Sequence, residues 1–202
     1  MTGDGGDVAA GMASTVIAAA FGDPDVLTVI EEPAAEPGPG QTRFSVRAAG
    51  INPVDYKAYS GAFGADPSRL PGRPGQEAAG VVSAVGPDAA GPAGPVAIGD
   101  EVIAYRVSGA YATELVAPAA ALVPRPAALD WAQAACLMVT GVTAWHLLAA
   151  TDVHEGDTVL IHGGSGGVGL MALQLAAGRG RRRWSPPARP STASCATWEP
   201  CR

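Results

Sequence analysis

The segment TVLIHGGSGGVGLMALQLAAG, at residues 158–178, constrains the possible folds more than any other stretch of this chain. A short apolar run typical of a buried strand leads into a glycine-rich turn, and an alanine- and leucine-rich run typical of a helix follows. Gly163, Gly166 and Gly169 lie three residues apart, a variant of the glycine pattern that binds dinucleotide pyrophosphates. The segment predicts either a nucleotide-binding turn or a tight strand-to-helix turn that binds nothing.

Phosphate binding would require particular backbone features in this turn. Bare N–H groups at a helix N-terminus bind phosphate, and side chains there would prevent close approach. A phosphate loop of the kinase type is disfavoured because no Gly-Lys-Ser/Thr sequence follows. The candidate cofactor-binding residues of the turn are Gly163, Ser165, Gly166, Gly167, Val168 and Gly169.

The chain before this segment has two parts with different patterns. Residues 12–126 contain short alternating or apolar runs separated by turns with glycine or proline, a pattern typical of a compact, mostly β unit. Residues 129–150 lack proline and carry Ala, Leu, Met and Trp at helical spacing. Asp130 is placed to cap the N-terminus of this helical region. We interpret Met138 and Trp145 as its core residues.

Composition and charge restrict the partners of the protein. The 202-residue chain is 48% hydrophobic, enough for a sizeable core. Residues 1–177 carry seven Lys/Arg and 18 Asp/Glu, which argues against nucleic acid or an anionic membrane as a partner, because both bind clustered cations.

The cellular setting is predicted from three further features. The three cysteines do not form a disulfide framework. No run reaches the roughly 18 apolar residues of a membrane helix. Asp4 and Asp7 stand where a signal peptide carries positive charge. We therefore expect a reduced, cytoplasmic protein.

Seven motifs occur in one order along the chain: FGDPDVLTV, PGPGQTRFSVRAAGINPVDYKAYSG, PGQEAAGVVSAVG, IGDEVIAY, GAYATELVAP, VTGVTAWHLL and GDTVLIHGGSGGVG. Together they resemble the zinc-independent quinone oxidoreductases of the medium-chain dehydrogenase/reductase superfamily, and the resemblance covers Met12 to about Ala177. It implies an α/β fold (α+β overall), with a GroES-like β-rich domain followed by a doubly wound Rossmann domain. It also implies hydride transfer from NADPH to a quinone or an activated carbon–carbon double bond (an enone) of a small-molecule substrate.

We expect four segments along the chain. Residues 1–11 are predicted to be a disordered leader, with Met12 as an alternative start to Met1. Residues 12–129 would form the GroES-like catalytic domain, and residues 130–177 the first part of the NAD(P)-binding Rossmann domain. Residues 178–202, with six Arg and one Glu, are predicted to be a non-native or disordered basic tail.

The predicted Rossmann domain is incomplete in this sequence. Such a domain needs about six parallel strands, but only one strand and one helix are predicted from the glycine turn onward. The acidic residue expected about 20 positions further on, for the ribose, is missing because residues 183–189 contain no Asp or Glu. We hypothesise that the tail from about Gly178 is translated in the wrong frame; the alternative is a genuine basic tail that binds an acidic partner. The chain is then either an active oxidoreductase or an inactive fragment of one, and a homodimer is expected only for a full-length chain.

No metal site is expected. In zinc alcohol dehydrogenases of the same superfamily, a ligand cysteine stands at the position of Asn52 and a ligand histidine at the position of Gln76. Neither amide replaces a thiolate or an imidazole well at Zn²⁺. His146, His154 and His162 lack the spacing of metal ligands. A zinc-type alcohol dehydrogenase is therefore the less favoured alternative.

Without zinc, hydrogen-bond donors or a cation must stabilise negative charge on the substrate oxygen. The resemblance implies that the loop NPVDYK, residues 52–57, lies beside the nicotinamide. We predict that Lys57 is the donor or cation near the substrate oxygen or cofactor ribose, that Asn52 orients the nicotinamide or substrate, and that Asp55 holds the loop. The alternative for Lys57 is a solvated surface lysine, and the alternative for Asp55 is a local turn-capping carboxylate. Tyr56 is interpreted as a packing residue.

Three further residues have predicted roles. The resemblance implies that Thr140 and Thr143 contact the nicotinamide carboxamide or a phosphate; the alternative is that both are small residues that allow close helix packing. Glu77 is predicted to be a buried structural acid paired with an arginine, rather than a catalyst.

Overall fold

The computed structural model describes residues 11–154, 157–178 and 182–184 of the chain. These residues form two compact units, one ending at Leu137 and one beginning at Met138. The division lies beyond residue 129, the boundary expected from the sequence, because the short helix after that residue packs on strands of the first unit. None of the described helices is long and apolar enough to cross a membrane.

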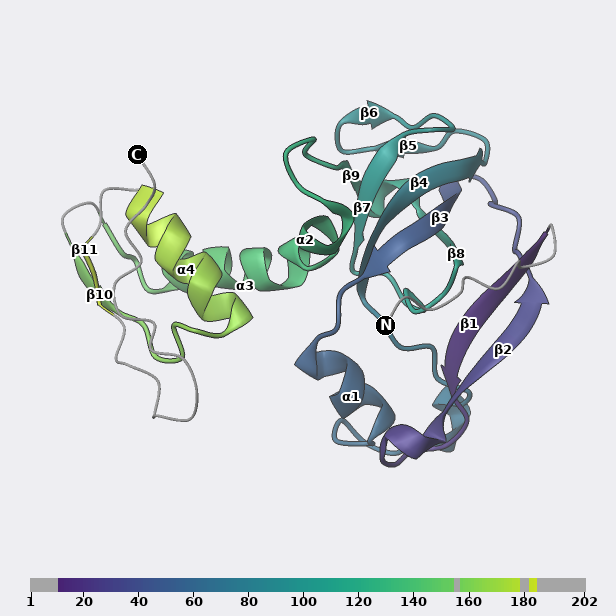
Figure 1. Cartoon of the computed structure of the whole chain (residues 1–202), viewed down its shortest axis with the longest axis horizontal. Coiled ribbons are helices and arrows are strands. Elements are labelled where there is room, and N and C mark those ends of the chain that lie inside the picture. Colours follow the sequence, from purple (N-terminus) through teal and green to yellow (C-terminus); the bar gives the residue numbers. More distant parts are fainter. Residues whose placement is uncertain (1–10, 155–156, 179–181, 185–202) are drawn as a thin grey trace. The chain divides into compact units, whose positions relative to one another are not determined.

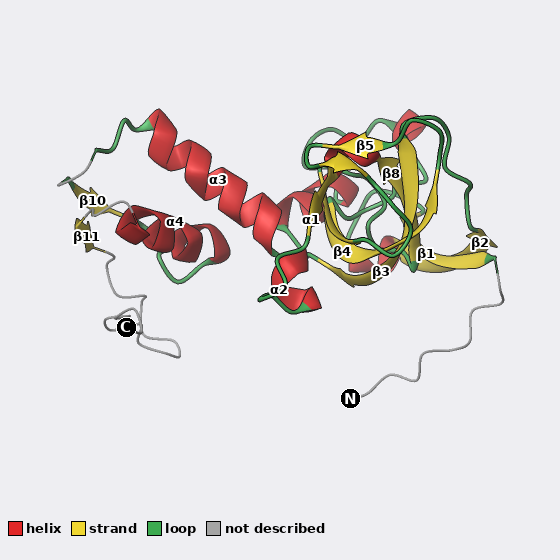
Figure 2. Ribbon diagram, turned by 90° about the horizontal axis from the view of Figure 1, so that it is seen from above, coloured by secondary structure: helices red, strands yellow, loops and turns green. Residues whose placement is uncertain are grey.

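An antiparallel five-stranded sheet is the centre of the first unit (Figure 2). Its strands, in spatial order, are β8 (Glu114–Pro118), β3 (Gln41–Ala49), β4 (Glu77–Val85), β7 (Glu101–Tyr105) and β9 (Leu122–Pro124). Irregular register between β3 and β4, at Arg43/Phe44 and Val46/Ala48, bends the sheet. Phe44, Val82 and Leu122 are buried in one core cluster. This arrangement confirms the β-rich first domain expected from the alternating runs.

A two-stranded antiparallel hairpin, β1 (Met12–Ala18) and β2 (Leu27–Pro33), lies beside that sheet (Figure 1). Backbone hydrogen bonds attach it to the rest of the unit. The Val16 N–H donates to the Tyr111 carbonyl at 2.8 Å, and Ala18 and Gly72 exchange two bonds of 2.8 and 2.9 Å. The hairpin therefore holds the chain segments around Gly72 and Tyr111 in place.

Short elements complete the first unit: η1 (Pro24–Val26), α1 (Pro53–Tyr59), η2 (Pro67–Arg69), β5 (Ala90–Gly91), β6 (Gly94–Pro95), η3 (Ala119–Ala121) and α2 (Trp131–Ala135). A capping box begins α2. The Asp130 carboxylate accepts from the Gln133 N–H at 2.7 Å, and the Gln133 side chain accepts from the Asp130 N–H at 3.1 Å. The structure therefore confirms Asp130 as the N-cap predicted for the helical region. Ala134 and Ala135 are fully buried in α2, which contacts β3 and β4.

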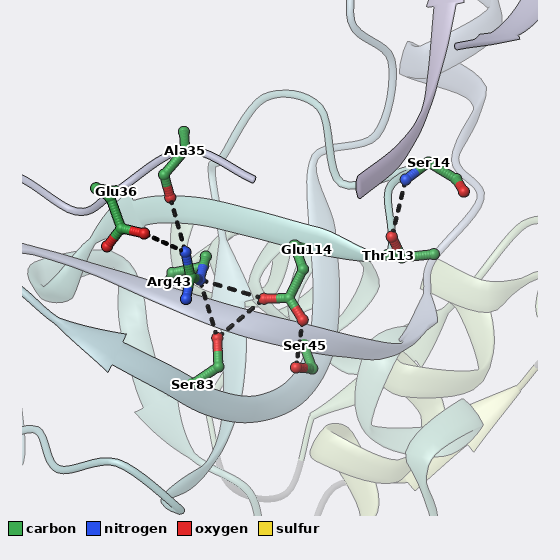
Figure 3. A network of polar contacts seen from close by, with 8 residues as sticks. All are labelled: Ser14, Ala35, Glu36, Arg43, Ser45, Ser83, Thr113 and Glu114. Atoms are coloured by element: carbon green, nitrogen blue, oxygen red, sulfur yellow. Dashed lines mark hydrogen bonds and ion pairs between the residues drawn. The ribbon is translucent and has the colours of Figure 1, made fainter. Parts of the chain in front are cut away.

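Polar side chains on three neighbouring strands form a network across the sheet (Figure 3). Glu114 of β8 accepts hydrogen bonds from Ser45 of β3 at 2.5 Å and from Ser83 of β4 at 2.9 Å. Arg43 of β3 donates to Ser83 at 3.3 Å and forms an ion pair of 2.9 Å with Glu36. A one-residue slip would turn such side chains to the opposite face, so the network stabilises the observed register.

The second unit contains most of α3 (Leu137–Ala150), together with β10 (Thr158–Leu160), α4 (Gly167–Gly178) and β11 (Arg182–Trp184). Strands β10 and β11 pair in parallel, and α4 connects them and contacts β11 (Figure 1). A strand, a crossover helix and a parallel strand form the repeating unit of a Rossmann sheet. The expected α/β character and the incomplete Rossmann part are therefore confirmed for the described residues.

Residues 182–184 lie within the segment 178–202 that is predicted to be a non-native or disordered basic tail, and the nature of that tail stays a prediction. These residues form β11 because a strand after a crossover helix can satisfy the open backbone groups of β10. Only one strand was expected in this part of the chain, and β11 is a second one. Residues 179–181 and 185–202 lie outside the described residues, as do residues 1–10 of the expected leader.

The helical region at residues 129–150 differs from its sequence interpretation in two ways. It consists of two helices, because the backbone leaves helical geometry at Cys136, with φ −100° and ψ 6°. Trp145 is 48% exposed, so its interpretation as a core residue is wrong. Ala144 and Leu148, one turn apart, are the buried residues of α3.

Candidate functional site

The loop between β3 and α1 holds Asn52 and Asp55 in fixed positions. Asn52 is the N-cap of α1 in an extended conformation, and Pro53 occupies the start of the helix, where its missing N–H costs no hydrogen bond. The Asp55 carboxylate accepts a hydrogen bond from the Asn52 N–H at 2.8 Å, which is one half of a capping box. Both residues are buried, with exposed fractions of 5% and 3%. This geometry fits both roles given for Asp55, a carboxylate that holds the loop and a local turn-capping carboxylate.

The Asn52 side chain extends toward the beginning of β4. Its Nδ2 donates to Glu77 Oε1 at 2.9 Å, and Glu77 is fully buried, as the sequence predicted for a structural acid. A Cβ atom on Gly50 would lie 2.5 Å from both Glu77 Oε1 and the Ala135 carbonyl oxygen. Only glycine at position 50 therefore leaves room for this buried pair.

Sequence reasoning missed Tyr111, which completes the hydrogen-bonded set. Its hydroxyl donates to Asp55 Oδ2 at 2.9 Å, so that one carboxylate oxygen accepts from both Asn52 and Tyr111. Burial, and after it the Asp55 carboxylate, raises the pKa of Tyr111 above its usual range. The phenol is therefore a stable donor at neutral pH. Gly75, with φ +96°, allows the approach, since a Cβ there would lie 2.7 Å from the Tyr111 ring.

Asp55 also lines a cleft of about 300 Å³ in the first unit. Helix α1, residues 69–76 and residues 107–108 contribute its walls, and we call it the α1 cleft. The second carboxylate oxygen, Asp55 Oδ1, is buried and has no hydrogen-bond partner in the part of the chain that the structure describes. A buried acceptor of this kind favours a partner that can donate. Gln76 lines the same cleft, whereas Asn52 and Lys57 do not; we regard this cleft as the candidate substrate site.

Lys57 and Tyr56 lie on the exposed part of α1. The Lys57 side chain is exposed, and within the described ranges it makes no hydrogen bond to Asn52 or Asp55. Its proposed contact with the substrate oxygen remains a prediction. Tyr56 is 51% exposed, so its interpretation as a packing residue is wrong.

Asn52 and Gln76 are the residues at which the resemblance implies the ligand positions of the zinc enzymes. Among the residues that the structure describes, no three His, Cys, Asp or Glu side chains form a possible metal site. Burial, with the Glu77 carboxylate adding to it, raises the pKa of the Cys136 thiol, which disfavours the thiolate form that binds metals. Zinc-free chemistry remains a prediction.

The glycine turn of the second unit connects β10 to α4, which begins at Gly167. Gly163 has φ +70°, and its carbonyl oxygen accepts from the Gly166 N–H at 3.0 Å. A Cβ on Gly169 would lie 2.2 Å from that same oxygen, so the turn itself requires glycine at position 169. Gly166 differs: it is exposed, and a Cβ there would be at an ordinary 3.4 Å from its nearest neighbour. The protein's own packing thus leaves the surface at Gly166 open to a ligand.

The other candidate cofactor residues take different positions around this turn. Thr140 lies against the start of α4, since a Cβ on Gly167 would be 2.9 Å from its Cγ2. The Thr143 hydroxyl donates to a backbone carbonyl one turn earlier in α3, at 2.6 Å. Ser165 is exposed in the turn, and Val168 is half-buried in the first turn of α4. The structure therefore brings Thr140 to the glycine turn and engages Thr143 with its own helix.

Comparisons with known proteins agree with this architecture. Residues 38–127 match the alcohol dehydrogenase GroES-like domain family. Quinone oxidoreductase of Pseudomonas aeruginosa is 39% identical over 168 residues, which cover 82% of this chain and 50% of the relative. Among solved structures, Escherichia coli quinone oxidoreductase complexed with NADPH is similar with a TM-score of 0.77 and 32% identity, over 85% of this chain and 52% of that chain. The CurK enoyl reductase is similar with a TM-score of 0.78 and 26% identity, over 88% and 55%.

A GroES-like β domain joined to a Rossmann βαβ unit defines a class of oxidoreductases. Within that class, the chain belongs to the quinone oxidoreductase-like proteins of the medium-chain dehydrogenase/reductase superfamily. It spans about half the length of the relatives it matches.

Proposed function

We propose that this chain functions in the NADPH-dependent reduction of a quinone or of an activated carbon–carbon double bond, without zinc. The observation that carries this proposal is the glycine turn before α4, where Gly166 is left open by the packing of the protein itself. The similarity to a quinone oxidoreductase complexed with NADPH and to an enoyl reductase supports the same reaction class.

The residues of the glycine turn fit a dinucleotide phosphate. The first turn of a helix leaves N–H groups without intrahelical partners, and the helix dipole places partial positive charge there. Gly163 to Gly169 would hold the pyrophosphate of NADPH at the start of α4, with Thr140 beside them. When bound, NADPH supplies the hydride for the reduction.

Residues of the first unit would orient and polarise the substrate. Asp55, held by the Asn52 N–H and the Tyr111 hydroxyl, fixes the loop, and the buried Asn52 amide is held by Glu77. Lys57 would donate a hydrogen bond to the substrate oxygen, where negative charge develops during reduction. A preorganised donor at that atom lowers the barrier because it needs no rearrangement when the charge appears.

Two alternatives make different predictions. A zinc-type alcohol dehydrogenase would need metal ligands at positions 52 and 76, and the contact of Asn52 with Glu77 favours a structural role for the first of these amides. A binding module without turnover would retain NADPH affinity but oxidise no cofactor.

The assay that tests the proposal follows the loss of the near-ultraviolet absorbance of NADPH in the presence of 1,4-benzoquinone or 2-cyclohexenone. We expect oxidation that depends on the acceptor and persists after treatment with a metal chelator. Loss of activity on chelation would favour the zinc-type alternative. Saturable NADPH binding without oxidation by either acceptor would favour the binding module.

A further inference from the structure

The α1 cleft has an uneven distribution of charge. Three charged side chains line it: Asp55 from α1, Arg69 from η2, and Arg73 from the segment that precedes β4. Phe21, Leu70 and other apolar side chains supply much of the remaining wall. What the cleft can bind depends on how many of these three charges are already compensated within the protein.

The charge of Arg73 is compensated. Its guanidinium donates to both carboxylate oxygens of Glu32, at 2.5 and 2.8 Å. The Arg73 hydrogen bond lowers the pKa of Glu32 to about 2, so this carboxyl remains ionised at neutral pH. These two hydrogen bonds fix the plane of the guanidinium and engage both of its terminal nitrogens. Arg73 is therefore already bound to the β1–β2 hairpin.

Asp55 gives the inner wall of the cleft a negative character. It is 3% exposed, its Oδ2 accepts the two hydrogen bonds from Asn52 and Tyr111, and its Oδ1 has no partner among the described residues. A ligand carboxylate beside this group would be repelled, and the repulsion is strongest where water is excluded. The inner wall therefore favours a donor or an uncharged group.

Arg69 provides the positive charge that no ion pair among the described residues holds in place, although the neighbouring Asp66 carboxylate interacts with it electrostatically. It is the last residue of η2, its side chain is exposed, and it forms no ion pair within the described part of the chain. The nearby Asp66 carboxylate accepts from the Ser68 N–H at 3.0 Å. A guanidinium with free donors at the edge of an apolar cleft is suited to a carboxylate, which it can bind through two parallel bonds.

From this arrangement we infer that the α1 cleft binds a small carboxylate-bearing enone, with its carboxylate on Arg69 and its carbon skeleton against the apolar wall at Phe21 and Leu70. This inference rests on the proposed function, because it names the substrate class of the same site. One cation and apolar walls favour a monoanionic carboxylate over a phosphate, which requires more donors. Arg69 is then the residue that determines specificity for the acid over an uncharged acceptor.

The test compares two product-like probes that differ in charge. Levulinate (4-oxopentanoate) and its methyl ester share a carbon skeleton and do not alkylate cysteine. Binding of each to the 202-residue chain is measured by calorimetry without NADPH. We expect levulinate to bind roughly tenfold or more tightly than the ester, a difference of about 1.4 kcal/mol. Arg69→Ala should abolish this preference.

Two variants separate the site from general charge. Arg69→Lys keeps a cation and should retain part of the preference for the acid. Arg47→Ala removes an exposed arginine of β3 that does not line the cleft, and should leave the preference unchanged. Circular dichroism of each variant verifies that the fold is intact.

Three results would overturn the inference: equal binding of acid and ester, an unchanged preference in Arg69→Ala, or binding of neither probe. The proposed function is judged separately, because this measurement contains no NADPH. Binding of levulinate that depends on Arg69, together with failure to oxidise NADPH, would contradict the proposed function and leave the carboxylate site in place.

Discussion

The Tyr111 hydroxyl donates a hydrogen bond of 2.9 Å to Asp55 Oδ2, the same oxygen that accepts the Asn52 N–H. The Tyr111 carbonyl in turn accepts from the Val16 N–H of β1. Through Tyr111, the β1–β2 hairpin supports the loop that presents Asn52. The candidate site is therefore held by contacts between segments that are distant in the sequence.

Tyr111→Phe is expected to destabilise the chain because it removes one of two donors from a buried carboxylate. The expected loss is about 1–3 kcal/mol of the free energy of unfolding, measured by urea denaturation. Tyr56→Phe is the matched control, since Tyr56 is 51% exposed, and it should change little. Equal stability of the two variants would show that the Tyr111 bond contributes nothing to the fold.

Glu32 is expected to make the stability of the first unit sensitive to acid. Its pKa is lowered from 4.5 to about 2 in the folded chain by Arg73. A lowered pKa means that the stabilisation is complete above the unfolded value and is lost as the pH falls from about 4.5 toward 2. Because the pair is partly exposed, we expect less than about 1 kcal/mol.

Urea unfolding of the wild-type chain and of Glu32→Gln, repeated from neutral to acid pH, measures this contribution. The wild type should be the more stable protein above the unfolded pKa, and the difference should shrink in acid. A difference that stays constant with pH would rule out the Arg73 pair as its cause. Asp25→Asn, at an exposed carboxyl in η1, is the control.

Gly169→Ala should destabilise the protein, whereas Gly166→Ala should have little effect on its stability. The added Cβ at position 169 would lie 2.2 Å from the Gly163 carbonyl oxygen, whereas at position 166 the nearest atom is at 3.4 Å. We expect Gly169→Ala to cost about 1–3 kcal/mol and Gly166→Ala to stay within about 0.5 kcal/mol. Hydrogen exchange of the α4 amides reports the local effect, and similar exchange in the two variants would contradict the geometry of the turn.

Lys57→Ala should lower kcat/KM for an enone by roughly tenfold or more, about 1.4 kcal/mol, if Lys57 donates to the substrate oxygen. Lys57→Arg retains the cation and should recover part of the activity. The NADPH oxidation assay measures both variants. If Lys57→Ala leaves kcat/KM unchanged, Lys57 is a solvated surface residue.

Local patterns predicted the local parts of this structure. The Asp130 cap depends on residues three positions apart, and the strand, glycine turn and helix of the second unit follow each other in the sequence. The motif order predicted a GroES-like domain at residues 12–129, and residues 38–127 match that family. Such features are set by neighbouring residues, which is why periodicity and capping signals reveal them.

Long-range contacts were not predictable in the same way. Tyr111 is 56 positions from Asp55, and Asn52 is 25 positions from Glu77, so no spacing rule connects either pair. Trp145 shows the converse error: an aromatic residue in a helical pattern is expected to be buried, but it is 48% exposed. Strand β11 was missed because its residues, Arg182–Trp184, lack the apolar run of a buried strand.

NADPH binding at the glycine turn is tested most directly by calorimetric titration of the folded 202-residue chain with NADPH. We expect saturable binding at one site. We also expect that Gly166→Val, which places a side chain where the pyrophosphate would approach, weakens the affinity by roughly tenfold or more while circular dichroism stays unchanged. Absence of saturable NADPH binding, or equal affinity of the wild type and Gly166→Val, would contradict NADPH binding at this turn.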